Sequence, residues 1–379
     1  MSSAPNLFRT ALYANHLAAN GRMVPFAGWL MPVQYEGVLS EAKAVRSKVG
    51  IFDVSHMGRM RIEGPTAGQF LERVLAFSVR NLKHGRARYG FVLTPKGGVI
   101  DDVIIYQQTS EDGPNGRYNL ICNAGNREIV ASWFQSHIAD YPGISVFDYT
   151  TNSVMIAVQG PHAKSTIDGI CVGENNPSAL PSFGSMSQSV KLRNVDPPVE
   201  VFIGRTGYTG EDGFEIIADA NSGSALWETL RLSGATPCGL GARDLLRLEA
   251  GLRLHGSDMD TSKSPLEAGL ARFVGMENKE FIGRKALTDQ QAMGLDEILV
   301  GFKLLEAGIP RHEHTLSKGS KQIGEVTSGT YSPTLDTGIG MGYVSLEYST
   351  PGDHINVNIR GRIVEAEIVK LPFYHRRKQ

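Results

Sequence analysis

Glycine recurs along the whole chain and limits the length of the elements that the chain can form. The 379 residues include 43 glycines and 18 prolines, which are spread through the sequence. Because both residue types interrupt regular structure, they divide the chain into short segments. The sequence therefore predicts many strands and turns with a minority of helices, arranged in two or three domains.

Composition excludes several classes of protein. Hydrophobic residues make up 41% of the chain, which is enough for a sizeable core, and the net charge is −1. A balanced charge argues against a nucleic-acid-binding protein that works by bulk charge. Cys122, Cys171 and Cys238 are far apart and form no CxxC pair. We therefore expect neither a disulfide framework nor a cysteine zinc site.

The N-terminal segment and the lengths of the apolar runs indicate where in the cell the protein is expected. The first residues, MSSAPNLFRTALYANHLAANGRMVPFAGW, lack the apolar stretch and cleavage site of a secretory signal. No apolar run approaches the ~18 residues that a membrane span requires. We expect a cytoplasmic protein without membrane or nucleic-acid partners, although composition alone leaves a transit peptide open.

The pattern of apolar residues predicts two kinds of unit. A helix at 65–75, strands at 89–93, 99–106 and 118–122, and a helix at 126–137 would form one compact α+β unit. After Arg284, five predicted strands indicate a separate all-β domain. The stretch between Cys171 and Pro198 is rich in Ser, Pro, Asn and Gly, so we expect a long surface loop there.

Two adjacent carboxylates stand inside an apolar strand, in the segment GGVIDDVIIY. Neighbouring residues of a strand face opposite sides, so at most one of Asp101 and Asp102 should point into a given pocket. The pair could end a hairpin in solvent. The apolar flanks also allow one carboxylate to be held in a partly dry cleft, as an acid–base or cation-orienting group.

Two further segments could bind a ligand. In RTGYTGEDGFEI, Phe214 and Ile216 share one strand face, so Glu215 points to the other face. There it is either solvated or accepts paired N–H donors of a heterocycle. Arg243 lies in the predicted first turn of a helix, where the helix dipole disfavours a cation. This position indicates an anionic partner, unless the arginine pairs with Asp244 or Glu249.

Six segments, taken together and in this order, resemble the glycine cleavage system T protein, an aminomethyltransferase family. The resemblance runs from about residue 6 to the LPF segment at 371–373. The segments are FAGW at 26–29, PVQY at 32–35, FDVSHM at 52–57, GGVIDD at 97–102, GYTGEDG at 207–213 and ARDLLRLEAG at 242–251.

The resemblance implies an α+β fold of three domains in a clover leaf around a folate channel, with ferredoxin-like parts and a C-terminal β-barrel or jelly-roll-like domain. We expect a discontinuous central folate-binding domain at 1–55 and 146–282. An inserted α+β domain would span 56–145, and the β-barrel domain would span 283–379.

The resemblance also implies a reaction and its residues. The aminomethyl group on the lipoyl arm of the H protein would pass to tetrahydrofolate, giving 5,10-methylenetetrahydrofolate and ammonia. Asp102 matches the essential aspartate, whose ionised carboxylate would orient the folate amine. Tyr89, Glu215 and Arg243 match folate-binding positions, and Arg376 is the candidate C-terminal contact. No metal is implied.

Relatives with the same fold leave alternatives. The oxidising enzymes carry a flavin domain upstream, and the iron–sulfur assembly factor carries a cysteine motif; neither feature is found here. A tetrahydrofolate-dependent sulfonium demethylase of similar length and a non-catalytic folate-binding module remain open. Asp102 discriminates between an enzyme and a binding module, because a binding module would tolerate its loss.

Overall fold

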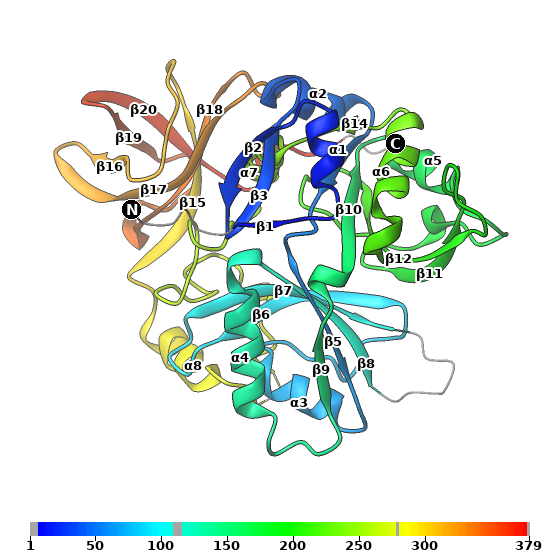
Figure 1. The fold of residues 1–379 in the computed structure, drawn as a ribbon. Helices are drawn as coiled ribbons and strands as arrows, with labels where there is room; N and C mark the ends of the chain where they lie inside the picture. Colours follow the sequence, from blue (N-terminus) through cyan, green and yellow to red (C-terminus); the bar gives the residue numbers. More distant parts are fainter. Residues whose placement is uncertain (1–6, 109–115, 278–279, 377–379) are drawn as a thin grey trace, which may run out of the picture.

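The strands of the protein group into three sheets and one closed barrel in the residues that the structure describes. The computed structural model describes residues 7–108, 116–277 and 280–376. In Figure 1 these residues form three lobes that meet near the centre of the molecule. The predicted α+β fold class with a C-terminal β-barrel is confirmed. No helix in the described ranges is long and apolar enough to cross a membrane.

The first lobe contains a six-stranded sheet of order β11-β12-β13-β10-β4-β14. Its strands are β4 (Gly50–Asp53), β10 (Ser153–Gln159), β11 (Ser185–Val190), β12 (Val199–Gly204), β13 (Gly213–Asp219) and β14 (Thr236–Pro237). A three-stranded sheet precedes it in the chain: β1 (Phe8–Arg9), β2 (Arg22–Phe26) and β3 (Trp29–Gln34). The long loop predicted between Cys171 and Pro198 is wrong, because β11 pairs along its full length with β12.

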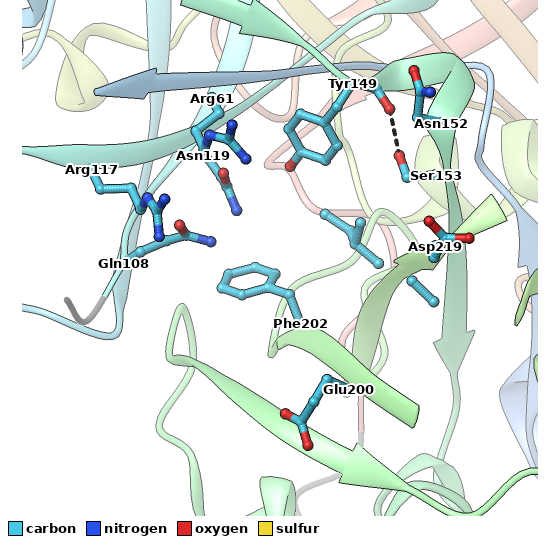
Figure 2. A pocket seen from close by; sticks show the side chains of 12 residues that line it. Arg61, Gln108, Arg117, Asn119, Tyr149, Asn152, Ser153, Glu200, Phe202 and Asp219 are labelled. Atoms are coloured by element: carbon cyan, nitrogen blue, oxygen red, sulfur yellow. Dashed lines mark hydrogen bonds between the residues drawn. The ribbon is translucent and has the colours of Figure 1, made fainter. Parts of the chain in front are cut away.

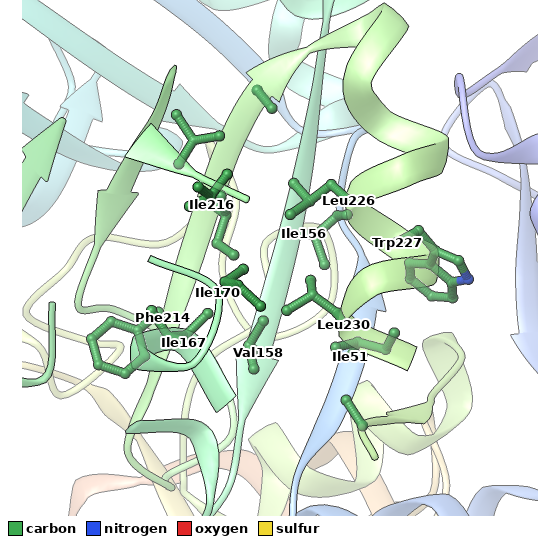
Figure 3. Close-up of a cluster of buried hydrophobic side chains, with 14 of the residues drawn as sticks. Ile51, Ile156, Val158, Ile167, Ile170, Phe214, Ile216, Leu226, Trp227 and Leu230 are labelled. Atoms are coloured by element: carbon green, nitrogen blue, oxygen red, sulfur yellow. The ribbon is translucent and has the colours of Figure 1, made fainter. Parts of the chain in front are cut away.

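Helices cover both faces of the six-stranded sheet. They are α1 (Tyr13–Ala18), α2 (Val38–Ser47), α5 (Ala163–Asp168), α6 (Gly223–Leu232) and α7 (Leu240–Glu249). Figure 3 shows Ile156 of the sheet beside Leu226 of α6, and Phe214 beside Ile167 of α5, within one buried cluster. On the other face, residues of α2 and α7 pack on β4 and β10. Alternation along β13 therefore turns its intervening side chains towards α7.

The second lobe is a five-stranded sheet of order β6-β7-β8-β5-β9. Its elements are β5 (Gly58–Glu63), α3 (Ala67–Val74), β6 (Arg86–Leu93), β7 (Val99–Gln107), β8 (Arg117–Cys122), α4 (Arg127–His137) and β9 (Ser145–Asp148). The predicted hairpin is confirmed as β6–β7, and Gly97 adopts φ +85° in its turn. Since β9 pairs with β5, this sheet continues to Asp148. The division into domains stays a prediction.

The third lobe is a closed barrel of order β15-β18-β17-β16-β19-β20. Its strands are β15 (Glu297–Leu304), β16 (Thr315–Lys318), β17 (Lys321–Ser332), β18 (Thr337–Ser345), β19 (His354–Ile359) and β20 (Arg362–Val369). A Cβ at Gly340 would lie 2.4 Å from the Phe302 ring, so glycine lets this ring fill the core. Before the barrel, α8 (Arg284–Met293) places Leu287 in a core cluster with Leu93 and Val99.

Candidate active site

Asp101 and Asp102 lie in β7, beyond the part of that strand that pairs with β8. The β7–β8 ladder starts at Ile104, so other groups can contact the strand edge beside the two aspartates. Asn123 follows β8 directly, and its Nδ2 donates to Oδ1 of Asp101 and to Oδ1 of Asp102, both at 2.8 Å. The two carboxyl groups therefore share one amide donor, although Asp101 is buried and Asp102 is partly exposed.

The two carboxyl groups favour their protonated forms. Asp101 is fully buried, and burial followed by the charge of Asp102 raises its pKa to about 7. Burial also raises the pKa of Asp102, against the opposing effects of His255, Asn123 and Tyr89. Such a pair can hold a proton near neutral pH and can take up or release it during a reaction.

Tyr89 is brought to Asp102, as the shared hairpin predicts. Its hydroxyl donates to Oδ2 of Asp102 at 3.1 Å across the β6–β7 pair. The Tyr89 ring packs edge-on against Phe273, with 4.9 Å between centroids. Burial, and then the charge of Asp102, raises the pKa of the Tyr89 phenol well above 10. Tyr89 therefore stays a neutral hydrogen-bond donor to Asp102.

Arg243 is a cation without a carboxylate at ion-pair distance among the described residues. It belongs to α7, and its guanidinium lies over the Tyr208 ring at 4.8 Å and 3.7 Å from Sδ of Met57. The alternative pairings with Asp244 and Glu249 are not formed, because Arg247 takes Asp244 and Arg46 takes Glu249. A cation in this position can attract a bound anion or the π face of a ligand.

Tyr208 connects this arginine with the carboxyl pair. Burial raises the pKa of the Tyr208 phenol, and the charge of Asp102 adds to the shift, so the two groups lie within electrostatic reach. The Tyr208 hydroxyl donates to the backbone carbonyl of Arg253. The hydroxyl end of Tyr208 is thereby fixed by the Arg253 carbonyl, and Arg243 lies over its ring.

Glu215 faces away from the Phe214–Ile216 core, as alternation along β13 predicts. It is 6% exposed, and Oγ1 of Thr206 donates to its Oε2 at 2.5 Å. Thr206 is bonded in turn to the hydroxyl of Tyr106 at 2.7 Å. Burial raises the pKa of Glu215, while Thr206 and the charge of Arg243 lower it. Its second oxygen, Oε1, is available for N–H donors of a ligand.

Arg376 is placed differently from the other four predicted residues. Its Nη1 lies 3.8 Å from Oδ1 of Asp212, and half of its side chain is exposed. Asp212 already accepts two hydrogen bonds from Arg205, at 3.0 and 2.5 Å. The structure therefore brings Tyr89 and Asp102 into contact, connects Arg243 with Glu215 electrostatically, and leaves Arg376 on an exposed ion pair.

Three residues around the carboxyl pair, Asn123, Asn126 and His255, are not among the predicted site residues. Asn123 and Asn126 donate to it, and Asn126 contacts His255 from the segment after α7. A polar Asn-Ala-Gly-Asn run directly after a buried strand was the available signal for the asparagines. Nothing in the local sequence marks His255, because only the tertiary fold brings it to β7.

A cavity of about 380 Å³ lies elsewhere, between the five-stranded and six-stranded sheets (Figure 2). Its basic residues, Arg61 and Arg117, come from the first of these sheets, and its acidic residues, Glu200 and Asp219, come from the second. None of the predicted site residues lines it. In the described ranges, no group of three or more His, Cys, Asp or Glu side chains is arranged to hold a metal ion.

Known proteins resemble this chain over nearly its whole length. An aminomethyltransferase of Prochlorococcus marinus (strain MIT 9303) is 41% identical over 372 residues, which cover 98% of this chain and 99% of the relative. An aminomethyltransferase of Thermosynechococcus vestitus is also 41% identical, over 99% of this chain and 98% of the relative.

A solved structure and two family models agree with these relatives. The crystal structure of glycine cleavage system aminomethyltransferase T from Bartonella henselae superposes with a TM-score of 0.89 at 32% identity, over 98% of this chain and 99% of that one. The GCVT N-terminal domain matches residues 12–278, and the glycine cleavage T-protein C-terminal barrel domain matches residues 298–375. With both domains matched in order, the chain belongs to the glycine cleavage T-protein family.

Proposed function

We propose that this protein is a tetrahydrofolate-dependent aminomethyltransferase. Its substrates would be an aminomethyl group, carried on the lipoyl arm of the H protein, and tetrahydrofolate. The carbon leaves sulfur and nitrogen and forms two bonds to folate nitrogens. Of the two N–H protons that folate loses, one ends on the dihydrolipoyl thiol and the other on ammonia. The products are 5,10-methylenetetrahydrofolate, ammonia and the reduced lipoyl arm.

The observation that carries this proposal is the buried carboxyl pair beside Tyr89. A reaction that moves two protons needs a group that can hold a proton near neutral pH. The Asp101–Asp102 pair has this property, and Asp102 is its partly exposed member. We assign Asp102 to the contact with the reacting folate amine, and Tyr89 to the orientation of its carboxyl group.

Glu215 and Arg243 would bind the folate. A buried carboxylate whose Oε1 accepts no hydrogen bond from the described residues suits the paired N–H donors of an aminopyrimidine ring. Arg243, without an ion-pair partner among the described residues, would compensate negative charge on the bound folate or stack on its ring. Arg376, whose Asp212 contact is long, is the candidate for a contact with the glutamate end of folate. The transfer needs no metal, and a cytoplasmic location fits the reaction.

A coupled assay tests this function. The purified chain is mixed with aminomethyl-loaded lipoyl H protein and tetrahydrofolate, and ammonia release is followed. We expect folate-dependent release in the wild type. In Asp102→Asn we expect a decrease of about a hundredfold or more with folate affinity within about threefold, because the amide binds but cannot exchange the proton.

Arg243→Gln serves as the matched variant, since it should lose folate affinity while the carboxyl pair is intact. Folate binding without any ammonia release from the lipoyl substrate would contradict the proposal and favour the demethylase or a binding module. Equal release by the wild type and Asp102→Asn would remove Asp102 from the chemistry.

A further inference from the structure

A histidine from the segment after α7 reaches the carboxyl pair through one amide. Asn126 Nδ2 lies 2.6 Å from Oδ1 of Asp101 and 3.0 Å from Nδ1 of His255. The other ring nitrogen, Nε2, lies 3.3 Å from the carbonyl oxygen of Val99. Asn126 is 8% exposed, so water has little access to its amide. The contacts therefore run from His255 through Asn126 to Asp101.

These contacts fix which atoms carry hydrogen. Nδ2 of Asn126 has two N–H groups, and only an unprotonated ring nitrogen can accept one of them. In this hydrogen-bond pattern Nδ1 of His255 accepts from Asn126, and Nε2 is the ring nitrogen placed to donate to the carbonyl of Val99. In this arrangement Asn126 presents an N–H group, and not its oxygen, to Asp101.

Hydrogen bonds are distributed unequally over the two carboxyl groups. Asp101 accepts three N–H bonds: one from Asn126, one from the Asn123 side chain and one from the Asn123 backbone. The carboxyl group of Asp102 accepts one N–H bond from Asn123 and one O–H bond from Tyr89. Donors stabilise the ionised form of a carboxyl group, so these N–H bonds oppose the rise in the pKa of Asp101 that burial and the charge of Asp102 cause.

We propose that His255 is a positioning residue: by accepting a hydrogen bond from Asn126, it holds the N–H donor of this amide against Asp101 and so favours the ionised form of Asp101. This rests on the proposed function, in which Asp102 meets the substrates. There the O–H bond of Asp102 breaks as an N–H bond of the departing ammonia forms, and a proton from a folate N–H restores Asp102. His255 touches neither substrate and acts through Asn126 and Asp101.

Several titratable groups surround these contacts, and each affects the titration of the pair. They are Asp101 and Asp102 of β7, Tyr89 of β6, Cys122 at the end of β8, Tyr208 of the glycine-rich segment, Arg253 beside Tyr89, and Asp260 beside His255. Because protonation of His255 would itself add a charge, the test uses replacements that do not titrate. His255→Phe keeps the ring size without an acceptor, and His255→Asn restores an acceptor near the position of Nδ1.

The experiment observes the carboxyl groups directly in the ligand-free protein. The ¹³C NMR signals of labelled aspartates are followed from pH 5 to 8, and Asp102→Asn identifies the signal of Asp102. We expect Asp101 to titrate about one pH unit higher in His255→Phe than in the wild type, because it loses a donor. His255→Asn should restore the wild-type titration, and His354→Phe, on an exposed barrel histidine, should not change it.

Kinetics supply the second readout. We expect ammonia release to be slower by about tenfold in kcat for His255→Phe, with folate KM within about twofold of the wild type. Unchanged Asp101 titration in His255→Phe would overturn the proposal, as would the same displacement in His255→Asn. If His255→Phe does not fold, Asn126→Ala removes the same donor and must displace Asp101 likewise. The NMR decides the role of His255 even if the wild type releases no ammonia, which would refute the proposed function alone.

Discussion

Two clusters of buried charge in the molecule differ in how their charges are balanced. In the first, Arg247 of α7 meets Asp258 at 2.6 Å, and its Nη2 donates to Ser328 of the barrel at 2.7 Å. Asp258 is fully buried and also accepts bonds from Ser328 and from Thr327. In the second cluster, Asp101 and Asp102 are two acidic groups whose hydrogen-bond partners among the described residues are neutral.

The difference separates a group that holds the lobes together from a group that is prepared for chemistry. Burial lowers the pKa of Arg247, but the charge of Asp258 acts in the other direction and the pKa is raised overall, so Arg247 stays a cation. For Asp101 and Asp102, burial and mutual repulsion both favour a bound proton. A buried pair of opposite charges is fixed in one state, whereas a buried pair of like charges has a proton to exchange.

The largest expected effect on stability comes from removing one partner of the Arg247–Asp258 ion pair. Asp258→Ala should lower the free energy of unfolding by about 3–5 kcal/mol, because it leaves Arg247 buried without its carboxylate. Urea unfolding, followed by circular dichroism, measures the change. Asp102→Asn is the matched substitution in the other cluster and should not destabilise the protein, since it removes a repulsion. A loss below about 1 kcal/mol in Asp258→Ala would contradict this assignment.

The Asp101–Asp102 cluster should make the stability of the protein depend on pH. Since the folded pKa of Asp101, about 7, lies above the unfolded value near 3.9, the folded chain binds more protons between these values. The free energy of unfolding should therefore decrease as pH rises from 5 to 8, by an amount on the order of 2 kcal/mol. Urea unfolding at four pH values should give a flatter curve for Asp102→Asn; parallel curves would refute the coupling.

The sequence predicted those parts whose pattern is local. The strands of the β6–β7 hairpin, β8, β13 and helix α7 carry clear apolar periodicity and a turn or helix signal, and they are confirmed. β11 was missed because alternating serines give an edge strand little apolar signal, and it pairs on one side only. The strands between residues 8 and 34 were missed as well, since their register depends on contacts between segments.

The candidate site shows the same division. Tyr89 and Asp102 belong to the two strands of one predicted hairpin, in which Tyr89 pairs with Ile104 and reaches Asp102 diagonally. The contact of both aspartates with Asn123, and of Asn126 with His255, joins β7 to the end of β8 and to the segment after α7. Such contacts depend on how the lobes pack, and no local periodicity encodes them.

The smallest expected effect concerns Arg376, whose ion pair with Asp212 is exposed, unlike the two buried clusters. Its contact with Asp212 is long and half-exposed, and Arg205 already neutralises Asp212. Arg376→Ala should therefore leave the free energy of unfolding within about 0.5 kcal/mol of the wild type.

If Arg376 meets the glutamate end of folate, the same variant should raise folate KM about two- to fivefold without changing kcat, because the contact is equal in ground and transition states. Ammonia-release kinetics at varied folate concentration measure this, with Lys285→Ala, on a surface pair of α8, as the control. An unchanged KM would remove Arg376 from the site and confine folate recognition to the buried residues around Tyr208.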